Sequence, residues 1–372
     1  MEQKTYKKVV MLADIHYGKH ASNIEWMENM NSYFHDFFIP WLKNEADDQT
    51  CLVIMGDYFD NRQSIDINIM ISAINTIKAI SQIVPVYMMV GNHDLYKKSG
   101  LDKSSLSCIE SIPNICIIDD KMDGVCTLNL TNGETITMIS WVGDHIKEAT
   151  LINEYKKTSP IIFLHTELCG MNYDNGREIT EGTIVKLPKG VRIFSGHIHK
   201  RQMNKSGSMM YIGSPYHMER SDIGNQKGIH MLYVDGIETK LQYVPNTFSP
   251  EYVKMTMTID ESGNWKLDKD LSKITNNYVD IEYDEDVANA INSNKVAEEL
   301  LKYKPKNLEF FPIPKHIEIN SEDIECGENV GVVAVSENTI RTMDLKKTLL
   351  ELVMKRNTKY IQEASEALGI QY

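Results

Sequence analysis

The first two-thirds of the chain repeat one pattern: an apolar run rich in Val, Ile and Met that ends in a short polar segment. The instances are KVVMLADIHYG, CLVIMGDYFD, VPVYMMVGNHD, PIIFLHTEL, VRIFSGHIH and MMYIGSPY. Apolar runs of this length suit strands that are buried on both faces. Amphipathic segments lie between several of them, and alternating strands and helices predict an α/β sheet with crossover connections.

Two of the intervening segments carry apolar residues at helical spacing, and we expect both stripes to face the core. The first stripe has Ser22 or Asn23 as a candidate N-cap. This first stripe comprises Met27, Met30, Phe34, Phe37, Phe38 and Trp41. The second stripe comprises Ile67, Met70, Ile71, Ile74 and Ile77.

Two segments predict antiparallel hairpins, so the fold is not purely parallel. GVCTLNLTNGETITMISW alternates around Asn132-Gly133, and GIHMLYVDGIETKLQYV turns near Asp235-Gly236. Beyond about residue 245 the polar signatures stop. Strand-like segments and a helix from about Asp286 to Tyr303 then predict a small α+β appendage. The sequence therefore divides into a main domain (1–245), an appendage (246–314), an acidic linker (315–337) and a helical tail (338–372).

Composition limits the setting in which the protein works. No apolar stretch is long enough to span a bilayer, and no signal peptide is expected. None of the six cysteines forms a C-x-x-C pair, which favours a reduced, cytoplasmic protein. The net charge of −13 has the wrong sign for a nucleic-acid binder. Any affinity for DNA must then come from a local patch, bound metals or a partner.

Polar side chains follow the ends of five predicted strands, which is where ligands bind in open α/β sheets. Imidazoles and carboxylates without thiolates suit Mn, Fe or Zn better than a cysteine-rich structural zinc site does. Asp57, after the Gly56 turn, is placed to bridge two ions. Each motif alone is uninformative, but the ordered set predicts a two-metal site. The set is Asp14, His16, Asp57, Asn92, His93, His165, His197 and His199.

The motifs D-x-H, G-D-x-x-D, G-N-H-D, H and G-H-x-H, in that order, resemble those of the calcineurin-like metallophosphoesterases. The spellings ADIHYG, GDYFD, GNHDL, HTELCG, GHIHK and YIGSPY, followed by QKGIHML, are similar to the SbcD-type nuclease subunits of double-strand-break repair complexes. Among these, the recombination endonuclease subunits of tailed phages resemble the chain most. The motifs cover residues 9–245, and beyond them only the domain order resembles the family.

The resemblance implies a four-layer α/β/β/α sandwich with a small α+β capping domain and a C-terminal helical arm. It also implies two divalent metal ions, with Mn²⁺ expected and Mg²⁺ as the alternative. Asp14, His16, Asp57 and His199 would hold one ion. The other ion would be held by Asp57, Asn92, His165 and His197.

Two further residues receive catalytic roles from the resemblance. His93 would stabilise the scissile phosphate or protonate the leaving oxygen instead of binding metal, and Asp94 would orient it. Asp60 stands where some relatives have His; we expect a structural hydrogen bond there and leave ligation as the alternative.

The SbcD-type nuclease subunits work with partners, and the resemblance implies the same partners for this chain. The implied partners are DNA, an SbcC-type coiled-coil ATPase gripped by the helical arm, and a second copy of the chain in a homodimer. The location would be the cytoplasm, that of the host if a phage encodes the chain. Basic residues near the motif loops predict a phosphate-binding rim, with solvated surface charge as the alternative. They are Lys97, Lys98, Arg177, Lys200, Arg201 and Arg220.

The expected function is that of a Mn-dependent DNA exonuclease and endonuclease acting in recombination or repair. The alternative is a metallophosphoesterase acting on phosphoproteins or small nucleotides. Protein phosphatases of the superfamily spell the second motif G-D-x-V-D-R-G, whereas this chain has GDYFDNRQ. A non-enzymatic scaffold is a third reading, and the full set of ligands counts against it.

Overall fold

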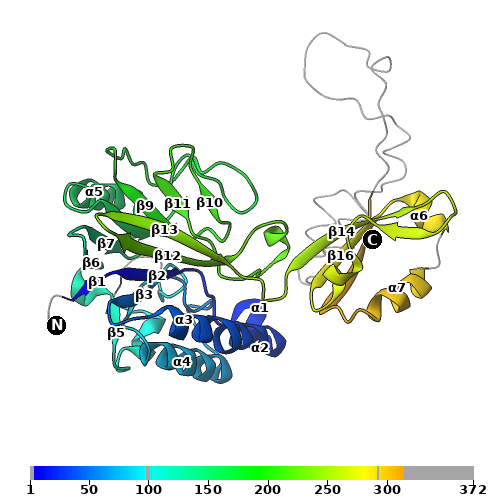
Figure 1. Ribbon diagram of the computed structural model, residues 1–372, viewed down its shortest axis with the longest axis horizontal. Coiled ribbons are helices and arrows are strands. Elements are labelled where there is room, and N and C mark those ends of the chain that lie inside the picture. Colours follow the sequence, from blue (N-terminus) through cyan, green and yellow to red (C-terminus); the bar gives the residue numbers. More distant parts are fainter. Residues whose placement is uncertain (1–3, 98–100, 102, 291–292, 314–372) are drawn as a thin grey trace, which may run out of the picture. The chain divides into compact units, whose positions relative to one another are not determined.

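The computed structural model describes residues 4–97, 101, 103–290 and 293–313 (Figure 1). Two stacked sheets form the larger part of the fold. The six-stranded sheet has the order β13-β12-β2-β3-β4-β5. Its four parallel strands are β2 (Lys8–Leu12), β3 (Thr50–Met55), β4 (Val86–Met89) and β5 (Ile115–Ile118). The hairpin of β12 (Gly228–Asp235) and β13 (Glu238–Pro245) extends it through an antiparallel pairing of β12 with β2.

The second sheet has seven strands in the order β1-β6-β7-β8-β9-β11-β10. Its strands are β1 (Thr5–Tyr6), β6 (Val125–Leu130), β7 (Thr135–Ile139), β8 (Ile161–His165), β9 (Arg192–Gly196), β10 (Gln202–Met203) and β11 (Met209–Tyr211). β7, β8, β9 and β11 run parallel, whereas β6 and β7 form an antiparallel hairpin. Both hairpins predicted from the Asn132-Gly133 and Asp235-Gly236 turns are confirmed.

Alternate residues of the central strands point to opposite faces and build separate cores. Val9 and Met11 of β2 pack with Phe163 of β8 in the core between the sheets. Val10 and Leu12 face the helices instead. Those helices are α2 (Ile24–Ser32), a π-helical segment (Tyr33–Phe38), α3 (Ile39–Glu45) and α4 (Ile67–Ser81). They cover one sheet, while α5 (His145–Tyr155) covers the other, so the predicted four-layer α/β/β/α sandwich is confirmed (Figure 1).

The predicted amphipathic helices are present, but one stripe was placed incorrectly. Asn23 is the N-cap of α2, because its side chain accepts a hydrogen bond from the backbone N–H of Trp26. In α4, Ile67 and Ile71 are 68% and 50% exposed. The buried face runs through Ile69, Ala73, Thr76, Ile77 and Ile80. The helix is apolar over most of its surface, so apolar spacing did not distinguish its buried face from its exposed one.

The remaining short helical elements lie between longer elements of the chain. They are α1 (Lys19–Ser22) and the 3₁₀ segments Ser105–Ile109, Asp120–Met122, Arg220–Asp222 and Leu271–Ile274. No helix in the described ranges is both long enough and apolar enough to cross a membrane.

A third sheet lies in the segment predicted as the appendage. Its order is β15-β14-β16-β17, formed by β14 (Tyr252–Ile259), β15 (Trp265–Leu267), β16 (Tyr278–Tyr283) and β17 (Asn307–Pro312). In the segment where a helix was expected over 286–303, the structure has α6 (Glu285–Ala290) and α7 (Ser293–Leu301), and residues 291–292 between them lie outside the described residues. Met255, Ile281 and Leu300 belong to the core of this segment. The linker 315–337 and the arm 338–372 lie outside the described residues, so the proposed division into domains stays a prediction.

Candidate metal centre

The carboxyl ends of strands from both sheets meet at one place and bring all eight predicted polar residues together. Asp14 and His16 follow β2, Asp57 follows β3, Asn92 and His93 follow β4, His165 ends β8, and His197 and His199 follow β9. Sheet stacking therefore joins residues that are far apart in the sequence.

The loops that carry these residues have unusual backbone conformations. Asp14, His16, Asp57 and His197 have φ values of 54°, 55°, 53° and 85°. Non-glycine residues seldom adopt this left-handed region, and such strain concentrates at functional sites. The first two loops also support each other, because the backbone N–H of His16 donates to the Asp57 carbonyl at 3.0 Å.

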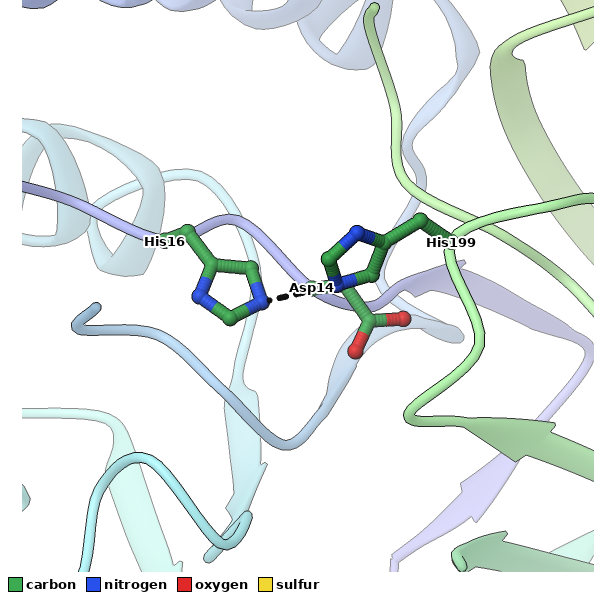
Figure 2. Close-up of side chains that lie close together, drawn as sticks. All are labelled: Asp14, His16 and His199. Atoms are coloured by element: carbon green, nitrogen blue, oxygen red, sulfur yellow. Dashed lines mark hydrogen bonds between the residues drawn. The ribbon is translucent and has the colours of Figure 1, made fainter. Parts of the chain in front are cut away.

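One cluster of potential ligands consists of Asp14, His16 and His199 (Figure 2). The Nε2 atoms of the two imidazoles lie 3.1 Å apart. The Oδ1 atom of Asp14 accepts the backbone N–H of His197 at 2.9 Å, whereas its Oδ2 atom is buried and has no hydrogen-bond partner. A buried carboxylate oxygen without a donor fits a cation in this cluster.

The second cluster consists of Asp57, His165 and His197, with Asn92 beside them. His165 Nδ1 lies 2.7 Å from the Met55 carbonyl, to which it can only donate. The Nε2 atom of His165 then presents a lone pair to the Asn92 Oδ1 atom at 3.0 Å and to the Asp57 Oδ2 atom at 3.2 Å. Three acceptor atoms thus converge, which calls for a cation or an added proton between them.

Asp57 lies between the two clusters. Its Oδ2 atom is 3.2 Å from His165 Nε2 and 3.7 Å from His16 Nε2. Its Oδ1 atom accepts the backbone N–H of His93 at 2.8 Å. One carboxylate oxygen therefore faces ligands of both clusters, as the predicted bridging role requires.

The electrostatics of the site favour positive charge at its centre. Burial alone would raise the pKa of Asp57, but His165 and His16 hold it well below its usual range. Burial would lower the pKa of His165, yet the Asp57 carboxylate raises it to about 9. Burial also lowers the pKa of His199 well below its ordinary value, so this imidazole is neutral and able to bind metal. Burial raises the pKa of Asp14, and a cation bound beside this carboxyl would oppose that effect.

His93 lies beside the clusters, and a backbone carbonyl fixes its ring. Its Nδ1 atom lies 2.7 Å from the Asp60 carbonyl oxygen, and its ring centre is 4.9 Å from that of His16. Burial lowers the pKa of His93.

The prediction that Asp94 orients His93 is wrong. The Asp94 carboxylate accepts backbone N–H groups of Tyr58, Phe59 and Gly91. It thereby ties the loop after β3 to the loop after β4 without contacting the imidazole. Asp60 contacts two histidines instead. Its carbonyl oxygen faces His93 Nδ1, and its Oδ1 atom is 3.0 Å from His16 Nδ1. A structural role for Asp60 agrees with this contact.

Two residues that sequence reasoning missed support the clusters. Glu167 Oε1 lies 3.2 Å from His197 Nε2, which leaves His197 Nδ1 facing Asn92 Oδ1 at 2.9 Å. Lys227 is buried, and its Nζ donates to the His199 carbonyl at 2.6 Å and to Ser214 Oγ at 2.8 Å. Glu167 lies in the HTEL motif and Lys227 in QKGIHML. The residues around them in the sequence gave no sign of these contacts.

The predicted basic rim is only partly available to a ligand. The Arg201 guanidinium lies 4.2 Å from the ring centre of Tyr243, and its Nε donates to His230. Arg220 forms ion pairs with Asp280 and Glu309 at 2.8 and 2.6 Å. Lys97, Arg177 and Lys200 are exposed, and Lys98 lies outside the described residues.

Comparison with known proteins finds a matching family and similar proteins. The model of the calcineurin-like phosphoesterase family matches residues 7–201. The protein named "Putative phosphoesterase 244L" of Invertebrate iridescent virus 6 is 26% identical over 212 residues, which are 56% of this chain and 69% of the viral protein. Among solved structures, a protein of unknown function from Aquifex aeolicus shares 15% identity with a TM-score of 0.27. That match covers 47% of this chain and 82% of the other.

Proposed function

The chain belongs to the calcineurin-like phosphoesterase family, and from this premise we propose that it is a metal-dependent nuclease that hydrolyses phosphodiester bonds in DNA. The proposed metal is Mn²⁺, with Mg²⁺ as the alternative. The observation that carries the proposal is the convergence of acceptor atoms from two clusters on the Oδ2 atom of Asp57.

The residues at the centre fit a pair of divalent cations. Such cations would act as Lewis acids toward a phosphoryl group. Asp14, His16 and His199 would hold one of them, and Asn92, His165 and His197 the other, with Asp57 shared. The contact of His93 Nδ1 with a carbonyl leaves Nε2 as the ring atom that can hold or pass a proton to substrate.

The choice of DNA over other phosphoesters rests on the spelling of the motifs. GDYFDNRQ lacks the arginine-glycine pair of protein phosphatases. A separate four-stranded sheet follows the sandwich in the chain, and a small-molecule esterase would have little use for it. We extend the proposal to an SbcC-type ATPase as partner, bound by residues 338–372, and to a homodimer acting in recombination or repair.

The test offers two substrates to the purified full-length chain with Mn²⁺: linear duplex DNA and bis(p-nitrophenyl) phosphate. Each is assayed with and without the candidate ATPase, whose association is measured by co-elution. The proposal predicts that both substrates are hydrolysed and that EDTA stops both reactions. Turnover of the small diester without any DNA degradation, even with the ATPase present, would instead support the esterase of small nucleotides or phosphoproteins.

A further inference from the structure

A surface groove of about 600 Å³ begins a few residues from the candidate metal centre. Arg62, Ser64, Tyr96 and Lys103 are among its lining residues, and Ile65 and Met70 supply apolar surface. Its volume falls within the range of about 300–1,000 Å³ typical of small-ligand pockets. The groove is thus large enough for one nucleotide.

The chain segments 62–65 and 103–105, which line the groove together with Tyr96, are tied to the catalytic loops. Asp60, two residues before Arg62, supplies the carbonyl that lies 2.7 Å from His93 Nδ1. Tyr96 follows His93 by three residues, and its backbone N–H donates to the Lys103 carbonyl at 3.0 Å. The backbone N–H of Ser105 donates to the Asp94 carbonyl at 2.8 Å. A ligand in the groove would therefore be held at a fixed position relative to His93.

The side chains of the groove offer two kinds of contact. Among the residues that the structure describes, no carboxylate lies within ion-pair distance of Arg62 or Lys103. Within that described part of the chain, the two cations are available to an anionic ligand, although the whole chain carries a net charge of −13. Tyr96 is 52% exposed, so its aromatic ring is accessible to a ligand.

We infer that this groove binds a single-stranded segment of nucleic acid next to the scissile phosphate, with a base stacked on Tyr96 and phosphates on Arg62 and Lys103. Cations along a groove combined with an exposed aromatic ring are how proteins hold single strands without reading their sequence. The inference rests on the proposed nuclease function and specifies its substrate as an unpaired or frayed strand.

The test measures binding directly, so that it does not depend on cleavage. Fluorescence anisotropy of a labelled oligothymidylate is recorded in EDTA with the full-length chain and with Arg62→Ala, Tyr96→Ala, Tyr96→Phe and Lys205→Ala. Lys205 is an exposed lysine that does not line the groove. Thermal melting midpoints check that each variant is folded.

We expect Arg62→Ala and Tyr96→Ala each to raise the Kd about tenfold, while Tyr96→Phe and Lys205→Ala stay near the wild type. Equal affinity in Tyr96→Ala and Lys205→Ala would overturn the inference, and so would tighter binding of a phosphoserine peptide than of the oligonucleotide. DNA cleavage by the wild-type chain is measured separately with Mn²⁺. Its absence would count against the nuclease function, and unchanged oligonucleotide binding in the variants would count against the groove.

Discussion

Individual side chains at the centre are held by contacts that assign them distinct tasks. Met55 orients His165, Glu167 contacts His197, and the Asp60 carbonyl contacts His93. Each contact engages one ring nitrogen and leaves the other for the site. Such outer contacts fix the tautomer of a metal ligand and tune its basicity.

The separation of His93 from the metal ligands is testable. In His93→Ala we expect both metals to remain bound while kcat for bis(p-nitrophenyl) phosphate falls about 10²- to 10⁴-fold, the usual contribution of a positioned proton donor. Metal content by mass spectrometry and steady-state kinetics provide the two readouts. His16, Asp60 and His93 also lie close enough to share an ion, so loss of metal from this variant would show that His93 is a ligand.

Glu167 is expected to act through His197. Glu167→Ala should weaken Mn²⁺ binding about 10- to 100-fold, as removal of outer contacts typically does. Glu167→Gln keeps an acceptor oxygen and should retain most of the affinity. Isothermal titration with Mn²⁺ compares the two variants, and equal affinities in both would argue against a positioning role.

A buried histidine outside the centre makes stability depend on pH. Burial, with a smaller effect of the Arg201 charge, lowers the pKa of His230 to about 3. The unfolded chain protonates this group near pH 6.5, so between those values it binds more protons than the native state does. Stability must then fall as the pH drops below about 6.5, by up to about 1.4 kcal/mol per pH unit from this group.

Urea unfolding at pH 7.5 and 5.5 isolates this effect when wild type and His230→Gln are compared. The variant should lose about 1 kcal/mol less free energy of unfolding between the two pH values. Equal losses would show that His230 does not titrate as its burial requires.

At the scale of elements, close packing between the loops after β3 and β4 positions the bridging carboxylate. A Cβ atom on Gly91 would lie 2.2 Å from Asp57 Oδ1 and 2.3 Å from the Asp57 backbone nitrogen. Only glycine lets the two loops approach this closely.

Gly91→Ala should therefore displace Asp57 and lower Mn²⁺ occupancy by at least tenfold, the size that metal-site distortions typically reach. Gly133→Ala is the control, because a Cβ atom there meets nothing within 4 Å, although its φ of 88° adds some strain. The Mn²⁺ content of the Gly91→Ala and Gly133→Ala variants is measured after gel filtration. Full occupancy in Gly91→Ala would mean that the loops can separate without loss of the site.

The sequence predicted the elements well wherever burial was complete on both faces. The strands before Asp14, Asp57 and His165 were readable because each ends a continuous apolar run. The exposed Ile67 and Ile71 were misplaced, because an apolar helix does not reveal its buried side. The wrong assignment of Asp94 has a similar cause: adjacency in sequence did not reveal that its carboxylate points to the neighbouring loop.

At the scale of the whole molecule, stacking of the two sheets creates the centre. Residues that follow β2 and β3 of one sheet cluster with residues at the ends of β8 and β9 of the other, so neither sheet alone carries a complete set of ligands. The sequence motifs identified the residues of the site. The distances between these residues depend on how the sheets stack, which no local pattern encodes. The contacts of Glu167 and Lys227 were unpredictable for the same reason.

The most direct measurement is an equilibrium titration of chelator-treated protein with Mn²⁺, with free Mn²⁺ followed by electron paramagnetic resonance. We expect two Mn²⁺ ions per wild-type chain and loss of both from Asp57→Asn, because one carboxylate oxygen faces both clusters. Wild-type protein that binds no Mn²⁺, or an Asp57→Asn variant that still binds two ions, would contradict it.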